Sequence, residues 1–140
     1  MAAEEREDFG GRVIRMYAAV FGIGFLLVWL LGLRSTADAF GVLNSDWAED
    51  FFHLATGLVL CYAAFFASPE NRDAAIIYQA VVYLIIGVYA FFNPDVFGLF
   101  PHGLGTVDNV IHLVEGGLSF VLVFAFGTSR YRLLAPRPAA

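Results

Sequence analysis

The chain is poor in charged residues and contains no lysine. Charged residues make up 15% of the sequence, whereas an average globular domain has about 25%. All 8 positive charges are arginines, and the 13 acidic residues leave a formal net charge of −5. A nucleic-acid-binding surface needs clustered cations to neutralise phosphates. The sequence offers no such basic patch, so we expect no nucleic-acid partner.

Cysteine is also scarce, and catalytic motifs are missing. The single thiol, Cys61, cannot form an internal disulfide, and we interpret it as a buried structural residue. The sequence has no glycine-rich phosphate loop and no Ser/His/Asp or Cys/His arrangement that would produce a nucleophile. We therefore expect no enzymatic activity and no catalytic residues.

Hydrophobic residues, in contrast, are abundant. They make up 59% of the chain, with 15 phenylalanines, against about 45–50% in a typical soluble domain. A helix needs about 20 mostly apolar residues to cross a bilayer. Four segments approach or reach this length, over residues 14–33, 47–68, 74–93 and 107–128. They predict an all-α, integral membrane four-helix bundle that forms a single transmembrane domain over residues 1–140, with the lipid bilayer as its partner.

The two ends of the chain have a different composition. Residues 1–11 are charged and residues 133–140 are rich in Pro and Ala, so we expect two mobile cytoplasmic tails. Ala37-Asp38-Ala39 imitates a signal-peptidase site, but the apolar run before it is longer than the core of a signal peptide. We therefore expect the first helix to be retained.

One short motif occurs twice. His53-Leu54-Ala55-Thr56-Gly57 has a counterpart in His112-Leu113-Val114-Glu115-Gly116, and an FG pair precedes each copy, at Phe40-Gly41 and Phe97-Gly98. Such self-similarity indicates duplicated structural units. It predicts two tandem helical hairpins with the same orientation, a parallel 2+2 repeat about an axis along the membrane normal.

The arginines are distributed unevenly among the loops, which predicts the orientation. One of them, Arg34, follows the first span, and the others lie at the opposite ends of the spans: Arg6, Arg12, Arg15, Arg72, Arg130, Arg132 and Arg137. Cytoplasmic loops carry the excess of positive charge. We therefore expect a multi-pass protein of the plasma membrane with both termini in the cytoplasm and all three histidines on the outer side.

Within each copy of the motif, His and Gly are four residues apart and so share a helix face. Glycine lets a neighbouring backbone approach closely in a membrane, so we expect Gly57 and Gly116 to be packing residues. The same face then turns His53 and His112 into the bundle. Each imidazole either hydrogen-bonds a neighbouring segment or belongs to a site.

Glu115 is the residue that packing explains least. Ionisable groups inside a span are costly unless paired and are functional candidates. We expect His112 or His53 as its partner, in a structural hydrogen bond or in a proton-exchanging pair. Together with Asp50 and Asp108, these residues form a predicted polar cluster near the outer surface.

A metal or haem site is a further interpretation of the same residues. His53, His112 and Glu115, with Asp108, are ligand types that suit zinc, iron or manganese. The HxxE spacing differs from the ExxH of di-iron carboxylate bundles. Two histidines on equivalent helices also suit a bis-histidine haem. We nevertheless expect no resident cofactor.

With these motifs the chain resembles a family of small four-helix prokaryotic membrane proteins, the domain of unknown function four-three-eight-three. The resemblance extends from about Arg12 to Tyr131. Its pattern points to one set of residues in each half: Asp50, His53 and Gly57, then Asp108, His112 and Gly116. It implies the four-helix fold and brings no activity with it.

Two functions are compatible with these observations. The first is a non-enzymatic structural or accessory subunit, in a homo-oligomer or a larger membrane complex. The alternative is a small protein that handles ions, protons or metals, or binds haem, through the outer-side His/carboxylate cluster.

Overall fold

The computed structural model describes residues 2–32, 47–128 and 131, with the backbone alone for residues 2–8. It contains four helices: α1 (Ala2–Gly32), α2 (Trp47–Phe65), α3 (Pro69–Ala90) and α4 (Thr106–Phe126). This all-α architecture confirms the predicted fold class. Helix α1 begins at Ala2, well before the predicted start at residue 14. The first FG pair and residues 133–140 lie outside the described residues.

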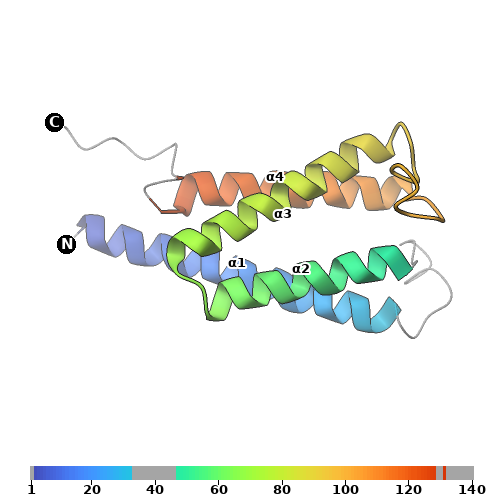
Figure 1. The fold of residues 1–140 in the computed structure, drawn as a ribbon. Helices are drawn as coiled ribbons and strands as arrows, with labels where there is room; N and C mark the ends of the chain where they lie inside the picture. The colour runs from blue at the N-terminus through green and yellow to red at the C-terminus, as the bar shows by residue number, and fades with distance from the viewer. Residues whose placement is uncertain (1, 33–46, 129–130, 132–140) are drawn as a thin grey trace.

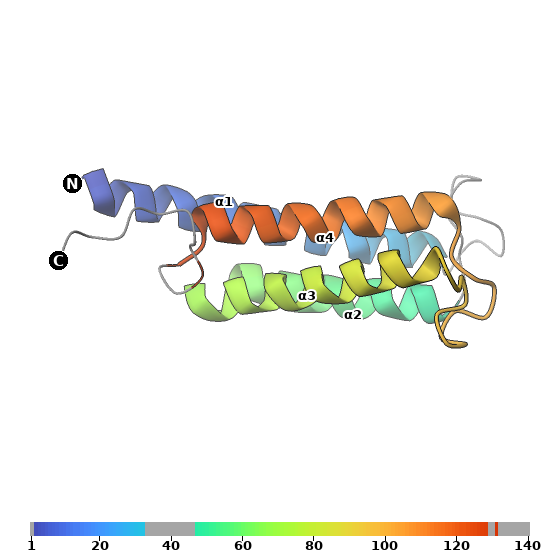
Figure 2. The same ribbon diagram turned by 90° about the horizontal axis from the view of Figure 1, so that it is seen from above.

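The helices pair as two antiparallel hairpins, α1–α2 and α3–α4 (Figures 1 and 2). Contacts are most extensive within each hairpin and much sparser between the hairpins. The start of α1 and the end of α4 lie at the same end of the bundle (Figure 1). We call this the terminal end, and the opposite one the loop end. The bundle therefore consists of two tightly packed helix pairs with a looser contact between them.

Three of the helices are long and apolar enough to cross a membrane, over Phe9–Gly32, Pro69–Ala90 and Thr106–Phe126. Helix α2, which has polar residues in its first two turns and runs alongside α1, is not among these three. On all four helices large apolar side chains face outwards, including Leu27, Leu58, Ile85 and Val121.

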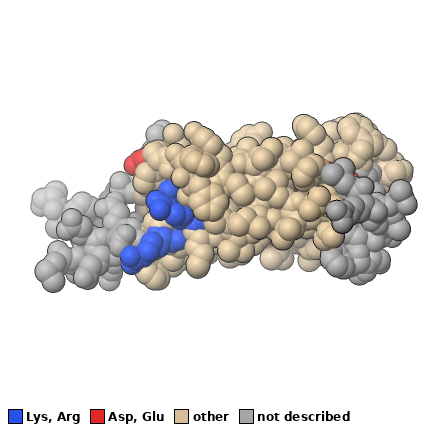
Figure 3. Space-filling view, turned by 90° about the horizontal axis from the view of Figure 1, so that it is seen from below, with Lys and Arg blue, Asp and Glu red and all other residues tan. Residues whose placement is uncertain are grey.

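The charged side chains of the described residues avoid the middle of the bundle surface. In Figure 3 the visible face is uncharged along its middle, and arginine side chains gather near the terminal end. Arg12, Arg15 and Arg72 all belong to helix turns at this end. An apolar belt with charges at its margin is what a bilayer requires of a protein surface.

The core consists of two apolar clusters at different depths. The larger one fills the middle of the bundle and its terminal half: Ile14, Tyr17, Ala18, Phe25, Leu60, Ala64, Ile76, Tyr83 and Val123. The smaller one closes the loop end, where the α3–α4 connection folds back over α2 and α3: Ala48, Ile86, Ala90, Val96, Phe100 and Leu104. Between Val96 and Gly98 this connection has positive φ values, which give it the sharp turn that returns it to the bundle.

The terminal end is closed by polar contacts. Ser68 caps α3 by accepting a hydrogen bond from the Asn71 N–H, 3.3 Å away, and Pro69 occupies the first turn. Arg72 is buried, and its Nε donates to the Ala63 carbonyl at 3.0 Å. Because the last carbonyls of a helix have no partner within it, this guanidinium completes the end of α2.

Candidate functional site

The repeated motif forms the tight contact within each hairpin. Gly57 lies against Gly22 of α1, so closely that an added Cβ would be 3.0 Å from the Gly22 carbonyl oxygen. Gly116 lies in the same way against Ala80 of α3, with 2.9 Å between an added Cβ and the Ala80 carbonyl oxygen. Both glycines therefore lie where the backbones of the two helices of a hairpin approach each other, as the sequence predicts.

The two histidines each contact an aromatic ring of the partner helix. The His53 ring is stacked on Phe25, with 5.6 Å between the ring centroids, and His112 meets Tyr83 edge-on at 5.0 Å. Phe25 and Tyr83 in turn contact each other at 5.5 Å. A row of four rings therefore links the two hairpins. The Nδ1 atoms of both histidines are buried and have no hydrogen-bond partner among the described residues.

Glu115 has a partner that the sequence analysis did not anticipate. The Gln79 side chain donates from Nε2 to Glu115 Oε1 at 2.8 Å. The Ser119 hydroxyl is 3.1 Å from Gln79 Oε1 and 2.8 Å from the Glu115 carbonyl, to either of which it can donate. Tyr17 OH lies 2.5 Å from the same Ser119 oxygen. We call these four buried residues the Glu115 network, which connects α1, α3 and α4.

A second polar contact lies beside this network. The Tyr83 hydroxyl donates to Thr56 Oγ1 at 3.3 Å and so connects α3 with α2. Thr56 occupies the same position in its motif as Glu115 in the other copy. Both of these motif positions therefore bind a side chain of α3, one through a hydroxyl and the other through a carboxylate.

Asp50 and Asp108, the acidic residues predicted to flank the histidines, lie in the first turns of α2 and α4. Asp108, the third residue of α4, is buried and accepts a hydrogen bond from the Gly105 N–H at 3.0 Å. Glu49 is the third residue of α2 and is equally buried. Glu49, rather than Asp50, therefore occupies the position that corresponds to Asp108. The Asp50 carboxylate lies against Gly32 at the end of α1, where an added Cβ would overlap it.

The polar groups extend over only part of the bundle. From the histidines in the second turns of α2 and α4, they reach Glu115 near the middle and end at Ser119 and Tyr17. One turn further towards the terminal end, the interior includes the fully buried apolar side chains of Ile14, Ile76 and Val123. This apolar layer separates the network from the charged terminal end.

The predicted ligand residues do not converge on one point. Among the described residues, no three His, Cys, Asp or Glu side chains lie close enough to hold one metal ion. The histidines lie against aromatic rings, Glu115 binds Gln79, and Asp108 caps its helix.

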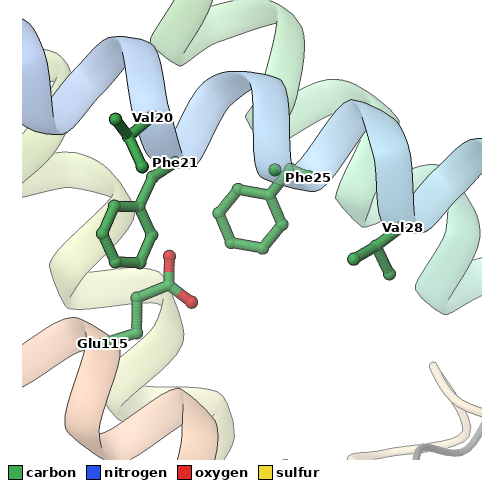
Figure 4. A pocket seen from close by; sticks show the side chains of 6 residues that line it. Val20, Phe21, Phe25, Val28 and Glu115 are labelled. Carbon is green, nitrogen blue, oxygen red and sulfur yellow. The ribbon is translucent and has the colours of Figure 1, made fainter. Parts of the chain in front are cut away.

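A groove of about 300 Å³ opens between α1 and α4 on the side of the bundle. It is lined by Val20, Phe21, Gly24, Phe25, Val28 and Glu115. Figure 4 shows the Glu115 carboxyl pointing from α4 towards the rings of Phe21 and Phe25 on α1. The walls of this α1–α4 groove are apolar, and Glu115 is the one ionisable group among its lining residues.

Sequence reasoning missed three members of the Glu115 network. Ser119 carried a usable signal, because it lies four residues after Glu115 on the same helix face. Gln79 carried another, since it is a polar residue in an otherwise apolar stretch, as Glu115 is. Tyr17 lies near the start of the first predicted span, and its hydroxyl is buried against Ser119.

The comparison with protein families gives one match. The model of a domain of unknown function, DUF4383, matches residues 9–66, which span most of α1 and all of α2. This match confirms the resemblance found in the sequence, over the first hairpin. The curated proteins gave no match. The solved structures gave none either.

Proposed function

Because residues 9–66 match a domain that has no known activity, we propose that this is a non-catalytic accessory or structural protein of the plasma membrane. The observation that carries this proposal is the Glu115 network, in which side chains of both hairpins are hydrogen-bonded to one another. In lipid, helices are held together by close packing and by such interhelical hydrogen bonds. The network thus fixes how the α1–α2 hairpin sits on the α3–α4 hairpin.

The shape of the bundle supports a role in assembly. Most of the described residues belong to the four helices, and the outward faces carry large apolar side chains on every helix. Such faces contact lipid or other membrane helices. We propose that the partners are a second copy of this chain or the subunits of a larger membrane complex.

The proposal includes a duplicated hairpin with cytoplasmic termini. Its support is that Gly57 and Gly116 make the same close contact in their hairpins, and that each motif histidine meets an aromatic ring of the preceding helix. The arginines at the terminal end support a cytoplasmic location for that end.

One set of variants tests the accessory role. In His53→Ala and Glu115→Ala proteins, we expect a lower melting temperature in mild detergent, with bound metal, visible absorbance and proton flux unchanged from those of the wild type. Stoichiometric metal or a Soret band in the wild-type protein, lost in both variants, would show instead that the cluster is a ligand site.

A second candidate function is proton or ion handling at Glu115. The specific observation in its favour is the continuous hydrogen-bond chain from Tyr17 through Ser119 and Gln79 to a carboxyl that opens into a groove. Against a complete pathway stands the apolar layer of Ile14, Ile76 and Val123. Reconstituted liposomes with a pH-sensitive dye separate the two functions, since proton flux that is lost in Glu115→Gln supports handling and the absence of flux supports the accessory role.

A further inference from the structure

The α1–α4 groove combines features that together select one kind of ligand. Its walls are apolar side chains of α1, and its polar feature is the Glu115 carboxyl from α4. One carboxyl oxygen, Oε1, accepts the hydrogen bond from Gln79. The other oxygen, Oε2, receives no hydrogen bond from any residue that the structure describes. The carboxyl therefore offers the groove an acceptor that the described residues leave unused.

The carboxyl also has no counter-charge among the described residues. No arginine or histidine in this part of the chain forms an ion pair with Glu115, and the donor that reaches it is a neutral amide. Both histidines of the motif contact aromatic rings instead. A buried carboxylate is stabilised mainly by an opposite charge close by. A cation bound in this groove would supply such a charge.

The aromatic rings beside the carboxyl favour the same ligand. Phe21 and Phe25 lie on the α1 side of the groove, and the carboxyl points towards them (Figure 4). The face of an aromatic ring attracts a cation within about 6 Å of its centroid, most strongly where water is excluded. A carboxyl with two phenylalanine rings is a combination that suits an alkylated ammonium better than a hydrated metal ion, which demands several oxygen ligands.

The position of the groove determines the route of entry. Val20 on its rim is 60% exposed, on the side of the bundle that faces lipid. A ligand that arrives there has passed through hydrocarbon, so it must be lipophilic. We propose that the α1–α4 groove binds a lipophilic organic cation from the bilayer, with Glu115 as its counter-ion and the rings of Phe21 and Phe25 against its alkylated ammonium group.

The test uses the full chain in lipid nanodiscs with benzyldecyldimethylammonium as the probe, because its decyl chain carries it into the bilayer. Its uncharged analogue is 2,2-dimethyl-1-phenyldodecane, in which carbon replaces the ammonium nitrogen. Ligand-observed NMR titrations, with empty nanodiscs subtracted, give both affinities. We expect saturable binding of the cation that is weakened about tenfold or more in Glu115→Gln, because the ion pair and part of the ring attraction are lost. The amide introduced by this substitution keeps an acceptor for Gln79, so the variant preserves the fold.

A second variant blocks the groove without touching the carboxyl. Gly24 lines the groove, and an added Cβ there meets nothing within 4 Å. Gly24→Leu should therefore fill the groove and abolish binding of the cation while the bundle stays folded. Gly117→Leu is the matched control, since Gly117 has equally free space, lies on α4 and does not line the groove. Binding to this control should equal that of the wild type.

Three results would overturn the proposal: equal binding by Glu115→Gln, undiminished binding by Gly24→Leu, or equally tight binding of 2,2-dimethyl-1-phenyldodecane. The last would identify the groove as a site for a lipid chain. Binding and stability are separate readouts. Failure of the accessory role would leave the melting temperature of Glu115→Ala unchanged, whereas failure of cation binding leaves the titration flat.

Discussion

Gln79 Nε2 donates a hydrogen bond to Glu115 Oε1 at 2.8 Å, and this bond links the third helix to the fourth in the middle of the bundle. Both side chains are buried. The amide also faces Ser119, whose hydroxyl meets Tyr17 of the first helix. Through Ser119, the Gln79 amide thus connects the Glu115 carboxyl of the second hairpin to Tyr17 of the first. The loss of either Gln79 or Glu115 breaks this chain of hydrogen bonds.

Removal of one partner should cost more than removal of both. In Gln79→Leu the carboxyl loses its donor, and in Glu115→Leu the amide loses its acceptor. Each single variant should lower the free energy of unfolding by about 1–2 kcal/mol, in the upper range for interhelical hydrogen bonds in membranes. The double variant, Gln79→Leu with Glu115→Leu, should be nearly as stable as the wild type. Reversible unfolding in mixed micelles measures all four proteins, and additive losses would contradict the prediction.

The close approach of α1 and α2 should tolerate no side chain at Gly22. A Cβ there would be 2.8 Å from the Cys61 backbone nitrogen, so Gly22→Ala must separate the two helices. We expect a loss of about 1–3 kcal/mol, the usual cost of overpacking a core. Gly24→Ala is the control on the same helix, because a Cβ at Gly24 meets nothing within 4 Å. Equal stability of the two variants would show that the hairpin contact is not this tight.

The sequence predicted the helices well because the bilayer imposes their length. Four apolar stretches separated by polar loops leave few arrangements for a chain of this size. The start of α1 was missed, since residues 2–8 contain charged residues that hydropathy assigns to a tail. Glu and Arg are nevertheless good helix formers, and outside the hydrocarbon they extend α1 back to Ala2.

The polar contacts were harder to predict than the helices. The motif correctly indicated that Gly57 and Gly116 face a partner helix, because spacing along one helix determines which residues share a face. The partner of Glu115 depends instead on how α3 is rotated against α4, which no spacing within α4 reveals. Gln79 is 36 residues away from Glu115 in the chain. That Glu115 binds Gln79 and neither histidine is therefore determined by the folded bundle.

Cysteine labelling should reveal which end of the bundle is cytoplasmic. In a Cys61→Ala background, Glu70→Cys places a thiol at the terminal end and His102→Cys places one in the α3–α4 connection. Both positions are exposed. A membrane-impermeant maleimide added to intact cells should label the cysteine at position 102 and spare the one at position 70, because the arginines favour a cytoplasmic terminal end. Permeabilised cells provide the control, in which both are labelled. The opposite pattern would reverse the orientation.

His112 should act through its ring rather than through its nitrogens. Its Nδ1 is buried without a hydrogen-bond partner among the described residues, and its ring meets Tyr83 edge-on. His112→Phe keeps the ring contact and removes the unpaired nitrogen, which is costly to bury. The free energy of unfolding should therefore stay the same or rise by about 1 kcal/mol. His102→Phe, at an exposed position, is the control and should change little. A marked loss of stability in His112→Phe, or the loss of a bound metal, would show that the imidazole nitrogen has a ligand in the membrane.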